Sequence, residues 1–539
     1  MTRDLSKLTS APVDVLVIGG GIHGLAVAYD AAQRGYAVAL VERGDFGSGS
    51  SFNHAKTVHG GLRSLQSGDV VKARFSVRER RAMARIAPHL VTPLSFVMAT
   101  THTITRSKMA LRLGFLADAL IGVDRNAGVE PHLRLPAGRV IPRDAYRSVF
   151  GANARAEATG GARWSDYHMA ESDRLTLAFA QAAYAHGAVL ANSVEALEPL
   201  VRAGRVEGIR AVDRLSGAAI DVAARITVNA AGAFCRPWMV AFGAKPDFPL
   251  LKAMNLVTTR PAGPVAMGAP TSGGRLLLIM PWHGRMLVGT SHSDTAAEPG
   301  DTTVSQGELR RFVDEVNSAF PALGLGADEV SLVHRGVVPA VADRRGVLGL
   351  MGHHRLHDHS ADGVDGAVSV VGVKYTTGRG VAEQVVDLIG RKLGRSALPC
   401  RTGTTRLPGA DFDSVRAETE RARSEIGRAI SPESIDALVA TYGAHWRAVA
   451  DLCRADTELA EPIAPGVPLP RAVVQYAVQH EMACTLADVL MRRTSLGAGG
   501  YPGDAVVDVC GALMARACSW DAGRLAREVE AVRAFYKVG

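Results

Sequence analysis

Paired cysteines, long apolar runs and blocks of like charge are missing from this sequence, and aromatic residues are scarce. Phe, Trp and Tyr together make up 5% of the 539 residues. The six cysteines form no CxxC pair and no zinc-ligand spacing, so we expect free thiols in a reducing compartment. No stretch of about 18 apolar residues occurs, which argues against a membrane-spanning helix. The N-terminal segment is polar and unlike a signal peptide, so we expect a cytoplasmic protein.

The formal net charge of +8 is spread along the chain without a long basic run. We therefore expect no nucleic-acid partner. The net charge is the only feature that supports the alternative hypothesis of a binding protein for nucleic acid or membrane surfaces. A positive charge of this size also suits an anionic small-molecule substrate, or peripheral contact with the inner face of the cell membrane. A chain of this length is expected to form at least two domains.

The most informative stretch is 13–42, which predicts a strand, a glycine turn, a helix and a second strand ending in an acid. Gly19 permits the tight turn, Gly21 lets a pyrophosphate approach the backbone, and Gly24 lets the helix pack closely on the strand. Glu42 follows the second strand and is placed to bind a ribose diol. Together these features predict a dinucleotide-binding unit, because the helix N-terminus offers free N–H groups to the phosphates.

Two later turns indicate which dinucleotide binds. Residues 226–232 form an apolar strand that runs into small residues, and residues 369–372 form another that leads directly into a helix. Each alone also fits an ordinary strand–turn–helix unit. Together with the opening turn, they favour FAD over a nicotinamide cofactor, because the helix after Thr376 would aim its positive end at the flavin ring.

The rest of the chain is expected to divide into an α/β part and a helical part. Helical periodicity covers 69–90, 104–122 and 304–320, and beyond residue 400 nearly everything predicts helices, including one over 469–492. We expect cofactor parts at about 1–75, 160–245 and 335–398, substrate parts at about 76–159 and 246–334, and a C-terminal helical domain at 399–539.

The sequence resembles the FAD-dependent glycerol-3-phosphate dehydrogenases, which belong to the D-amino-acid-oxidase-like flavoenzymes. The resemblance covers nearly the whole chain. The HGGLR segment at 59–63 and the GxKxTT-like segment at 372–377 are quite specific to the family. Further matching stretches are 15–42, 164–166, 228–232, 280–282 and 288–290.

The resemblance implies a two-domain FAD-binding Rossmann-type fold of α/β (α+β) class, with a mixed-sheet substrate domain and an all-α C-terminal domain. It also implies oxidation of the secondary alcohol of a glycerol-3-phosphate-like anion or polyol, with hydride passing to flavin N5. Electrons would then pass to quinone or O2. The resemblance is compatible with a homodimer and with peripheral membrane contact through the basic and apolar stretch 104–122.

Residues that match the family's motifs are the expected site residues. His59 is the first candidate for the base, with His54 as the second. Arg63 and Lys374 are expected at the reacting centre. The expected substrate contacts are Arg63, Lys252, Asn255, Arg335 and Lys374. The expected FAD contacts are Gly19, Gly21, Gly24, Glu42, Arg43, Ser50, Ser51, Lys56, Gly60, Gly61, Ala231, Gly232, Gly372, Lys374, Tyr375 and Thr376.

Several positions depart from the family's pattern, and all fall in the expected substrate pocket. Val338 stands where the family has an arginine for phosphate, Asn255 where bacterial members often have a histidine, and Ser64 where a tyrosine is usual. Valine cannot form the paired hydrogen bonds that arginine gives to phosphate. The alternative function is therefore FAD-dependent oxidation of a non-phosphorylated hydroxy or amino compound.

The histidine-rich run 353–359 suggests a metal site at first sight. No separated cysteine or carboxylate cluster supports one, so we expect a solvated hairpin loop and no metal. We also expect His23, inside the glycine turn, to act as a spacer.

Overall fold

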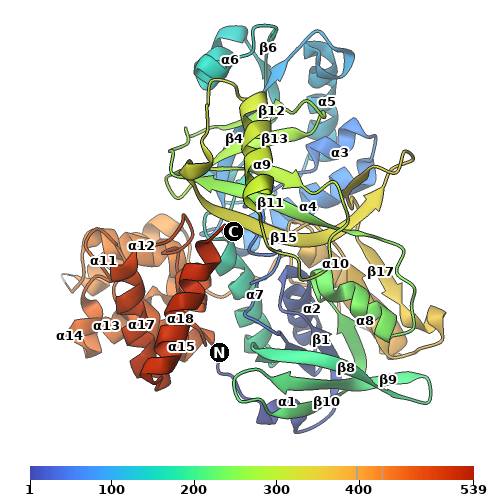
Figure 1. The fold of residues 1–539 in the computed structure, drawn as a ribbon, viewed down its shortest axis with the longest axis vertical. Coiled ribbons are helices and arrows are strands. Elements are labelled where there is room, and N and C mark those ends of the chain that lie inside the picture. Colours follow the sequence, from blue (N-terminus) through green and yellow to red (C-terminus); the bar gives the residue numbers. More distant parts are fainter. Residues whose placement is uncertain (396–397, 428, 539) are drawn as a thin grey trace.

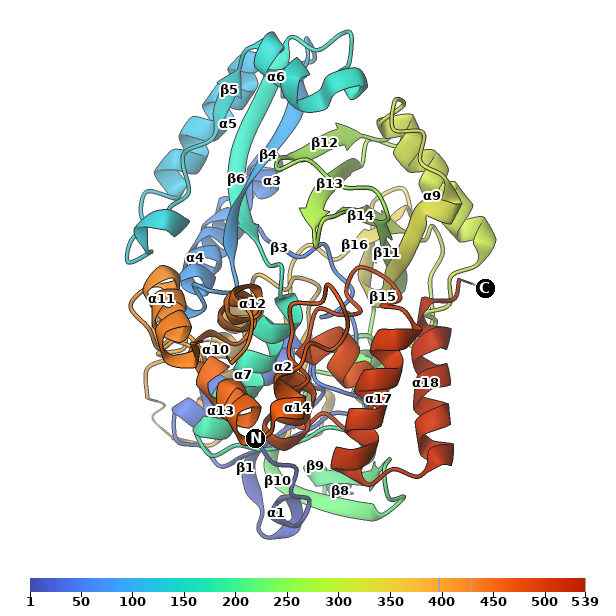
Figure 2. The same cartoon turned by 90° about the vertical axis from the view of Figure 1, so that its left-hand side faces the viewer.

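The computed structural model describes residues 1–395, 398–427 and 429–538, without the side chains of Arg63 and Gln66. Two β-sheets lie one beyond the other along the long axis, and a helical unit packs beside the lower sheet (Figure 1; Figure 2). This arrangement confirms the predicted fold class.

The first sheet is built around the opening strand β1 (Val13–Ile18), which pairs in parallel with β2 (Val38–Val41) and with β10 (Ala219–Asn229). Its spatial order is β17 (Arg355–Asp358), β18 (Ala367–Val371), β10, β1, β2 and β7 (Val189–Ala191), with β9 (Arg205–Asp213) and β8 (Val194–Arg202) extending from β10. Because β1, β10 and β18 run in parallel, the turns that follow them meet at one edge of the sheet.

Helix α2 (Ile22–Gln33) packs between α7 (Ser172–Ala185) and α10 (Gly378–Lys392). Its small and apolar residues are buried nearly all round, as expected for a helix enclosed by a sheet and two helices. The glycine turn fits this packing, since a Cβ on Gly24 would lie 1.9 Å from the Gly19 carbonyl oxygen. A Cβ on Gly19 would meet the Ala230 carbonyl oxygen at 2.7 Å, so this turn abuts the one that follows β10.

The second sheet contains the strands of the segments 76–159 and 246–334. Its order is β16 (Leu348–Leu350), β15 (Val330–Ala342), β11 (Leu250–Thr258), β14 (Arg285–His292), β13 (Leu276–Trp282), β12 (Ala266–Pro270), β4 (Thr92–Thr100), β6 (Gly160–His168) and β3 (Thr57–Val58), with β5 (Arg139–Ile141) beside β6. The sequence placed 160–168 and 335–350 with the cofactor parts. The structure places them in this sheet, because β6 pairs with β4 and β15 pairs with β11 along nearly their whole lengths.

Four helices surround the second sheet: α4 (Val70–Ile86), α5 (Lys108–Ile121), α6 (Arg143–Phe150) and α9 (Gln306–Ala319) (Figure 2). The short helix α3 (Leu62–Gln66) lies between α4 and α5. The predicted helices over 69–90, 104–122 and 304–320 are confirmed, and Ser305 caps α9 through a reciprocal capping box with Glu308.

The helical unit contains α11 (Val415–Ile426), α12 (Pro432–Tyr442), α13 (Trp446–Ala455), α14 (Thr457–Ala460), α15 (Ala472–Glu481), α16 (Leu486–Asp488), α17 (Asp504–Cys518) and α18 (Ala522–Tyr536). The prediction of one helix over 469–492 is wrong. Met482 takes a left-handed conformation, Thr485 caps a new helix, and residues 489–493 form a π-turn. The break presents Arg492 and Arg493 to the buried Asp45 of the first sheet's loop.

The expectation of a loop at 353–359 is also wrong in part. Residues Arg355–Asp358 form β17, which pairs with β18, and His359 is fully buried. His353 pairs with Asp69, and His354 bonds Gln384. A β-strand forms here because 355–358 finds a partner along the edge of the first sheet.

Candidate active site

The glycine turn leaves space at the N-terminus of α2. Gly21 caps the helix, and a Cβ there would meet only the Ser51 hydroxyl, at 3.2 Å, among the described atoms. That hydroxyl accepts a hydrogen bond from Ile22 N at 2.9 Å. The backbone is therefore open to a ligand where the helix dipole favours negative charge.

Glu42 is fixed at the end of β2. Its two carboxylate oxygens accept hydrogen bonds from Gly20 N and Gly44 N, each at 2.7 Å. Burial raises the pKa of this carboxyl group. The neighbouring Arg43 lies over the ring of Phe234, 4.5 Å from its centroid. Glu42 is thus held beside the glycine turn by backbone hydrogen bonds.

The turns after β10 and β18 are joined by a buried hydrogen bond. Asn229 Nδ2 donates to Ser369 Oγ at 2.9 Å, and Asn229 Oδ1 accepts from Ala231 N at 3.3 Å. Gly232 has a positive φ of 59°, and a Cβ there would meet no atom of the described residues within 4 Å, so this side of the turn is open. A Cβ on Gly372 would meet His23 Nε2 at 2.8 Å, so His23 contacts the later turn as well as spacing the first.

The loop from 50 to 56 closes over these turns. Ser50 Oγ donates to the Val337 carbonyl at 3.0 Å. Lys56 is fully buried, and its ammonium group donates to Phe52 O at 2.6 Å and to Ser172 Oγ at 3.0 Å. Burial lowers the pKa of this ammonium group, and Asp173 at 3.5 Å opposes that shift. Lys56 therefore ties the loop to the start of α7 through its side chain.

His59 joins the second sheet to the turn after β18. Its backbone N donates to Thr376 Oγ1 at 3.1 Å, and its Nδ1 lies 3.6 Å from Asp166 Oδ2. Asp166 is buried, accepts from Gly60 N at 2.7 Å, and pairs with Arg80 of α4. These contacts, led by the Arg80 charge, lower the pKa of Asp166 against the opposing effect of burial.

The sequence did not single out Asp166 or Arg80 as site residues. The signal for Asp166 was present in the 164–166 motif, but the partner on α4 is 86 residues away in sequence. A Cβ on Gly60 would clash with the Arg80 guanidinium, and one on Gly61 with Ser76 and Ala73. Both glycines thus let the His59 loop lie directly against α4.

Several imidazole nitrogens near these turns are buried and have no hydrogen-bond partner among the described residues. They are His23 Nε2, His54 Nε2, His168 Nδ1 and both ring nitrogens of His334. Burial lowers the pKa of His23 and of His168 to about 4, and holds those of His54 and His334 well below the usual range. Buried polar atoms are almost always satisfied, so such a group indicates a ligand or ordered water.

A family model described as FAD dependent oxidoreductase matches residues 14–388. This chain belongs to the family of FAD-dependent oxidoreductases. A second model, described as the C-terminal domain of alpha-glycerophosphate oxidase, matches this oxidoreductase over residues 400–525.

Relatives of similar length support this assignment. A glycerol-3-phosphate dehydrogenase of Synechocystis sp. is 30% identical, with 98% of this chain and 97% of the relative covered. Glycerol-3-phosphate dehydrogenase 1 of Mycobacterium bovis is 33% identical, with 92% and 94% covered. The crystal structure of the Bacillus halodurans glycerol-3-phosphate dehydrogenase complexed with FAD has the same fold, with a TM-score of 0.77, 23% identity, and 99% and 96% coverage.

FAD is the cofactor of this oxidoreductase. The two turns fit it, because Gly21 and Gly232 leave the backbone open where a side chain would obstruct a dinucleotide. Glu42 would hold the ribose, and the start of α10 would face the flavin ring with its positive end. Lys56 N donates to His54 Nδ1, so neutral His54 carries its proton on the unpartnered Nε2, a donor available to the cofactor.

Lys374, Tyr375 and Thr376, three of the expected cofactor residues, follow β18. The Tyr375 ring stacks on His54, with centroids 4.7 Å apart, and its hydroxyl bonds Thr176 at 2.8 Å. Lys374 lines a cavity of about 190 Å³, together with apolar side chains that include Phe75 and Met351.

Two of the expected substrate cations, Lys252 and Arg335, are bonded to other groups of the protein. Lys252 Nζ lies 2.8 Å from Glu308 and 3.5 Å from Asp301, and donates to the Thr303 carbonyl. Arg335 donates to the Phe535 carbonyl at 3.0 Å. The side chain of Arg63 lies outside the described part of the structure.

Asn255 lies on β11 opposite His334 of β15, and Val338 lies on β15 opposite Leu251 of β11. Asn255 is buried and accepts a hydrogen bond from Thr290 Oγ1 at 2.7 Å. Its amide is thus held by β14. Val338 adds no charge at the position where the family has an arginine.

Proposed function

We propose that this oxidoreductase oxidises the secondary alcohol of a glycerol-3-phosphate-like anionic substrate. Bound FAD would supply the acceptor for hydride, at flavin N5. His59 would take the hydroxyl proton, and Arg63 and Lys374 would bind the substrate's negative charge.

The observation that carries this proposal is the position of His59. Its backbone bonds Thr376 in the flavin turn at 3.1 Å, while its ring lies against Asp166 at 3.6 Å. A carboxylate beside an imidazole orients the ring and stabilises its protonated form, which is what a general base needs. The His59 side chain is 51% exposed, so a substrate can reach it.

A second candidate substrate is a non-phosphorylated hydroxy or amino compound. It is favoured because three positions considered for phosphate binding offer no unpaired positive charge. Val338 is uncharged, Lys252 is paired with two carboxylates, and Arg335 bonds a main-chain carbonyl. A phosphate dianion would therefore depend on Arg63 and Lys374. Such a site suits a singly charged substrate at least as well.

Anaerobic flavin bleaching separates the two candidates. The FAD-loaded enzyme would be titrated with glycerol 3-phosphate, glycerol, 2-hydroxy acids and amino acids, with absorbance read near the flavin maximum. Bleaching by glycerol 3-phosphate but not by glycerol supports the first candidate. Bleaching only by compounds without phosphate supports the second. Val338→Arg should lower the KM for a phosphorylated substrate by about tenfold, because a charged hydrogen bond is gained.

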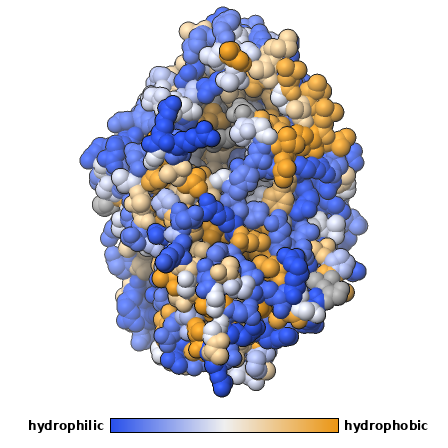
Figure 3. Space-filling view, turned by 90° about the vertical axis from the view of Figure 1, so that its right-hand side faces the viewer, coloured by the Kyte–Doolittle hydropathy of each residue, from blue (hydrophilic) through white to orange (hydrophobic). Residues whose placement is uncertain are grey.

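We further propose that the electron acceptor is a membrane quinone and that α5 rests on the lipid surface. Its outer face exposes Met109, Leu113, Leu116 and Leu120, spaced at one helical stripe, each more than half exposed. This stripe coincides with an apolar area at the upper right of Figure 3. Arg112 is exposed on the same helix, which suits anionic headgroups.

Vesicle cosedimentation tests the membrane contact. The wild type should bind vesicles with anionic lipid more tightly than neutral ones, and Leu113→Glu/Leu116→Glu should abolish binding while the FAD spectrum stays unchanged. The wild type could instead bind no lipid, and the variant could change from dimer to monomer in sedimentation. That result would assign the stripe to a homodimer interface.

Among the described residues, no helix combines the length and the hydropathy needed to span a bilayer.

A further inference from the structure

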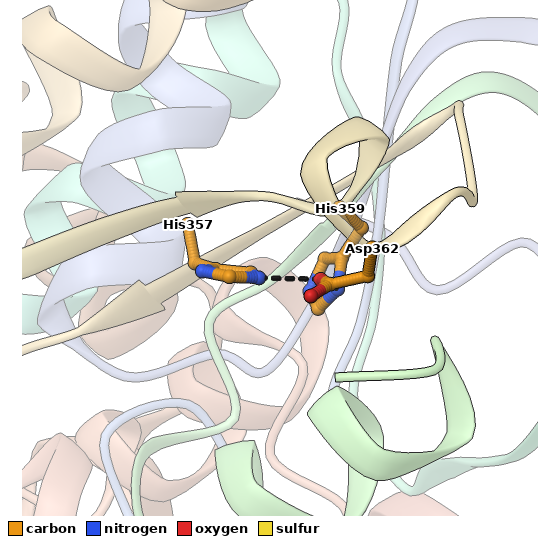
Figure 4. Close-up of side chains that lie close together, drawn as sticks. All are labelled: His357, His359 and Asp362. Carbon is orange, nitrogen blue, oxygen red and sulfur yellow. Dashed lines mark hydrogen bonds and ion pairs between the residues drawn. The ribbon is translucent and has the colours of Figure 1, made fainter. Parts of the chain in front are cut away.

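The edge of the first sheet, at β17, carries a cluster of potential metal ligands. None of them is among the residues expected to contact FAD or substrate. His357 stands on β17, and His359 and Asp362 stand on the single 3-10 turn that follows (Figure 4). One ligand atom from each residue lies within 4.8 Å of the others, and this is the group of that kind found among the described residues. We propose that these three side chains bind a divalent transition-metal ion of the Zn²⁺ class.

The donor set and its spacing fit such an ion. Two imidazoles and one carboxylate are ligands that Zn²⁺ prefers, and three protein ligands leave a fourth position for water. A tetrahedral Zn²⁺ holds its ligand atoms about 3.3 Å apart. His359 Nδ1 lies 3.1 Å from Asp362 Oδ2, and His357 Nε2 lies 2.5 Å from the same oxygen, so small side-chain shifts admit the ion.

The groups around the cluster hold His359 as a metal ligand is held. Its Nε2 lies 2.8 Å from Ser369 Oγ, which in turn is bonded by Asn229. Metal-binding histidines usually have their second ring nitrogen fixed in this way. The pairing of β17 with β18 places His357 directly opposite Ser369, so the two side chains lie on the same face of the sheet.

The neighbouring carboxylates leave Asp362 to this cluster. His359 is fully buried beside Asp362. The nearby Asp358 and Asp365 are both paired with Lys392, at 2.7 and 2.9 Å, so Asp362 remains the carboxylate directed at the imidazoles.

Access is open on one side. His357 is 34% exposed and Asp362 21% exposed, whereas His359 is enclosed. An ion bound here would cross-link β17 to the turn that leads into β18. His359 is connected to Ala231 through hydrogen bonds by way of Ser369 and Asn229. Metal binding would therefore stiffen the turn at Ala231, which is expected to contact FAD.

Calorimetric titration of the FAD-loaded, EDTA-treated enzyme with ZnCl2 tests the proposal, with Co²⁺ absorption as a second readout. We expect one site per chain, a raised Tm, and a Co²⁺ visible band typical of nitrogen and oxygen ligands. His357→Ala and Asp362→Asn should each remove the site, and Ser369→Ala should weaken it by about tenfold. Flavin absorbance reports that each variant is folded and loaded.

His353→Ala is the matched control, because His353 belongs to the same run but pairs with Asp69 outside the cluster. It should leave the affinity for Zn²⁺ unchanged. Equal Zn²⁺ binding by the wild type, His357→Ala and Asp362→Asn would overturn the proposal, since the ion would then be held by other histidines or by cysteines. Absence of any binding by the wild type would overturn it equally.

Discussion

The backbone N of His59 donates a hydrogen bond to the Thr376 hydroxyl, at 3.1 Å, across 317 residues of sequence. This contact ties the loop that carries the proposed base to the turn that would face the flavin. The His59 loop and the turn after β18 are therefore held together, although they belong to different sheets.

Thr376→Val should lower kcat by about tenfold or more, because small displacements of a reacting group cost large factors in rate. FAD content should stay near that of the wild type, since the variant keeps the size and shape of the side chain. Thr376→Ser keeps the hydroxyl and should restore most of the activity. Steady-state kinetics and flavin absorbance measure both effects, and a valine variant of full activity would separate His59 from catalysis.

Asp45→Asn should destabilise the contact between the first sheet and the helical unit. Asp45 is buried between Arg492 and Arg493, at 2.6 and 2.7 Å, and those charges hold its pKa far below the usual range despite burial. Removing one partner from a buried ion pair costs about 3–5 kcal/mol.

Asp436→Asn is the control for Asp45→Asn, because its pair with Arg423 is exposed to solvent and contributes little to stability. Thermal unfolding should show a clear loss of Tm for the first variant and little change for the second. Equal Tm values would mean that the helical unit is held mainly by its apolar contacts.

Acid should destabilise the protein well before its carboxylates are protonated. His168 has a pKa of about 4 in the folded state because it is buried, against about 6.5 when unfolded. The unfolded state binds the proton first, so this stability is complete above pH 6.5 and is lost as pH falls towards 4. The slope is about 1.4 kcal/mol per pH unit for each such group.

Tm measured from pH 8 to pH 5 tests this linkage. His168→Gln should give a shallower fall than the wild type, whereas His132→Gln, at an exposed position, should not. Identical profiles for all three proteins would show that His168 is not protonated in this range even when the chain unfolds.

Lys252→Met distinguishes a structural from a substrate-binding lysine. The ammonium group binds Glu308 and the Thr303 carbonyl, so its loss should cost about 2 kcal/mol of stability. The KM of the best substrate should change less than twofold. Lys374→Met, in the turn after β18, should raise that KM at least tenfold if this lysine binds the substrate as proposed. A KM raised at least tenfold by Lys252→Met, without a loss of stability, would instead assign Lys252 to the substrate site.

Local sequence patterns were enough for much of the fold. The glycine spacing at 19–24 predicted the opening unit, and the periodicity over 304–320 predicted α9, because these signals are local in sequence. Periodicity failed at 469–492, where an apolar pattern continues through a change of direction. Arg492 and Arg493 follow this break in the helix and bind the Asp45 carboxylate, which lies more than 440 residues earlier in the sequence.

The same distinction applies to the site. The sequence by itself determined the opening strand, glycine turn and helix, and so predicted a dinucleotide at this turn, because the backbone needs no side chain there. Only the tertiary structure decided that Asp166 and Arg80 support His59, that Lys252 is neutralised by Glu308, and that His357 and His359 converge on Asp362. Charges interact through space, so the partner of a polar side chain is fixed by packing and not by its neighbours in the chain.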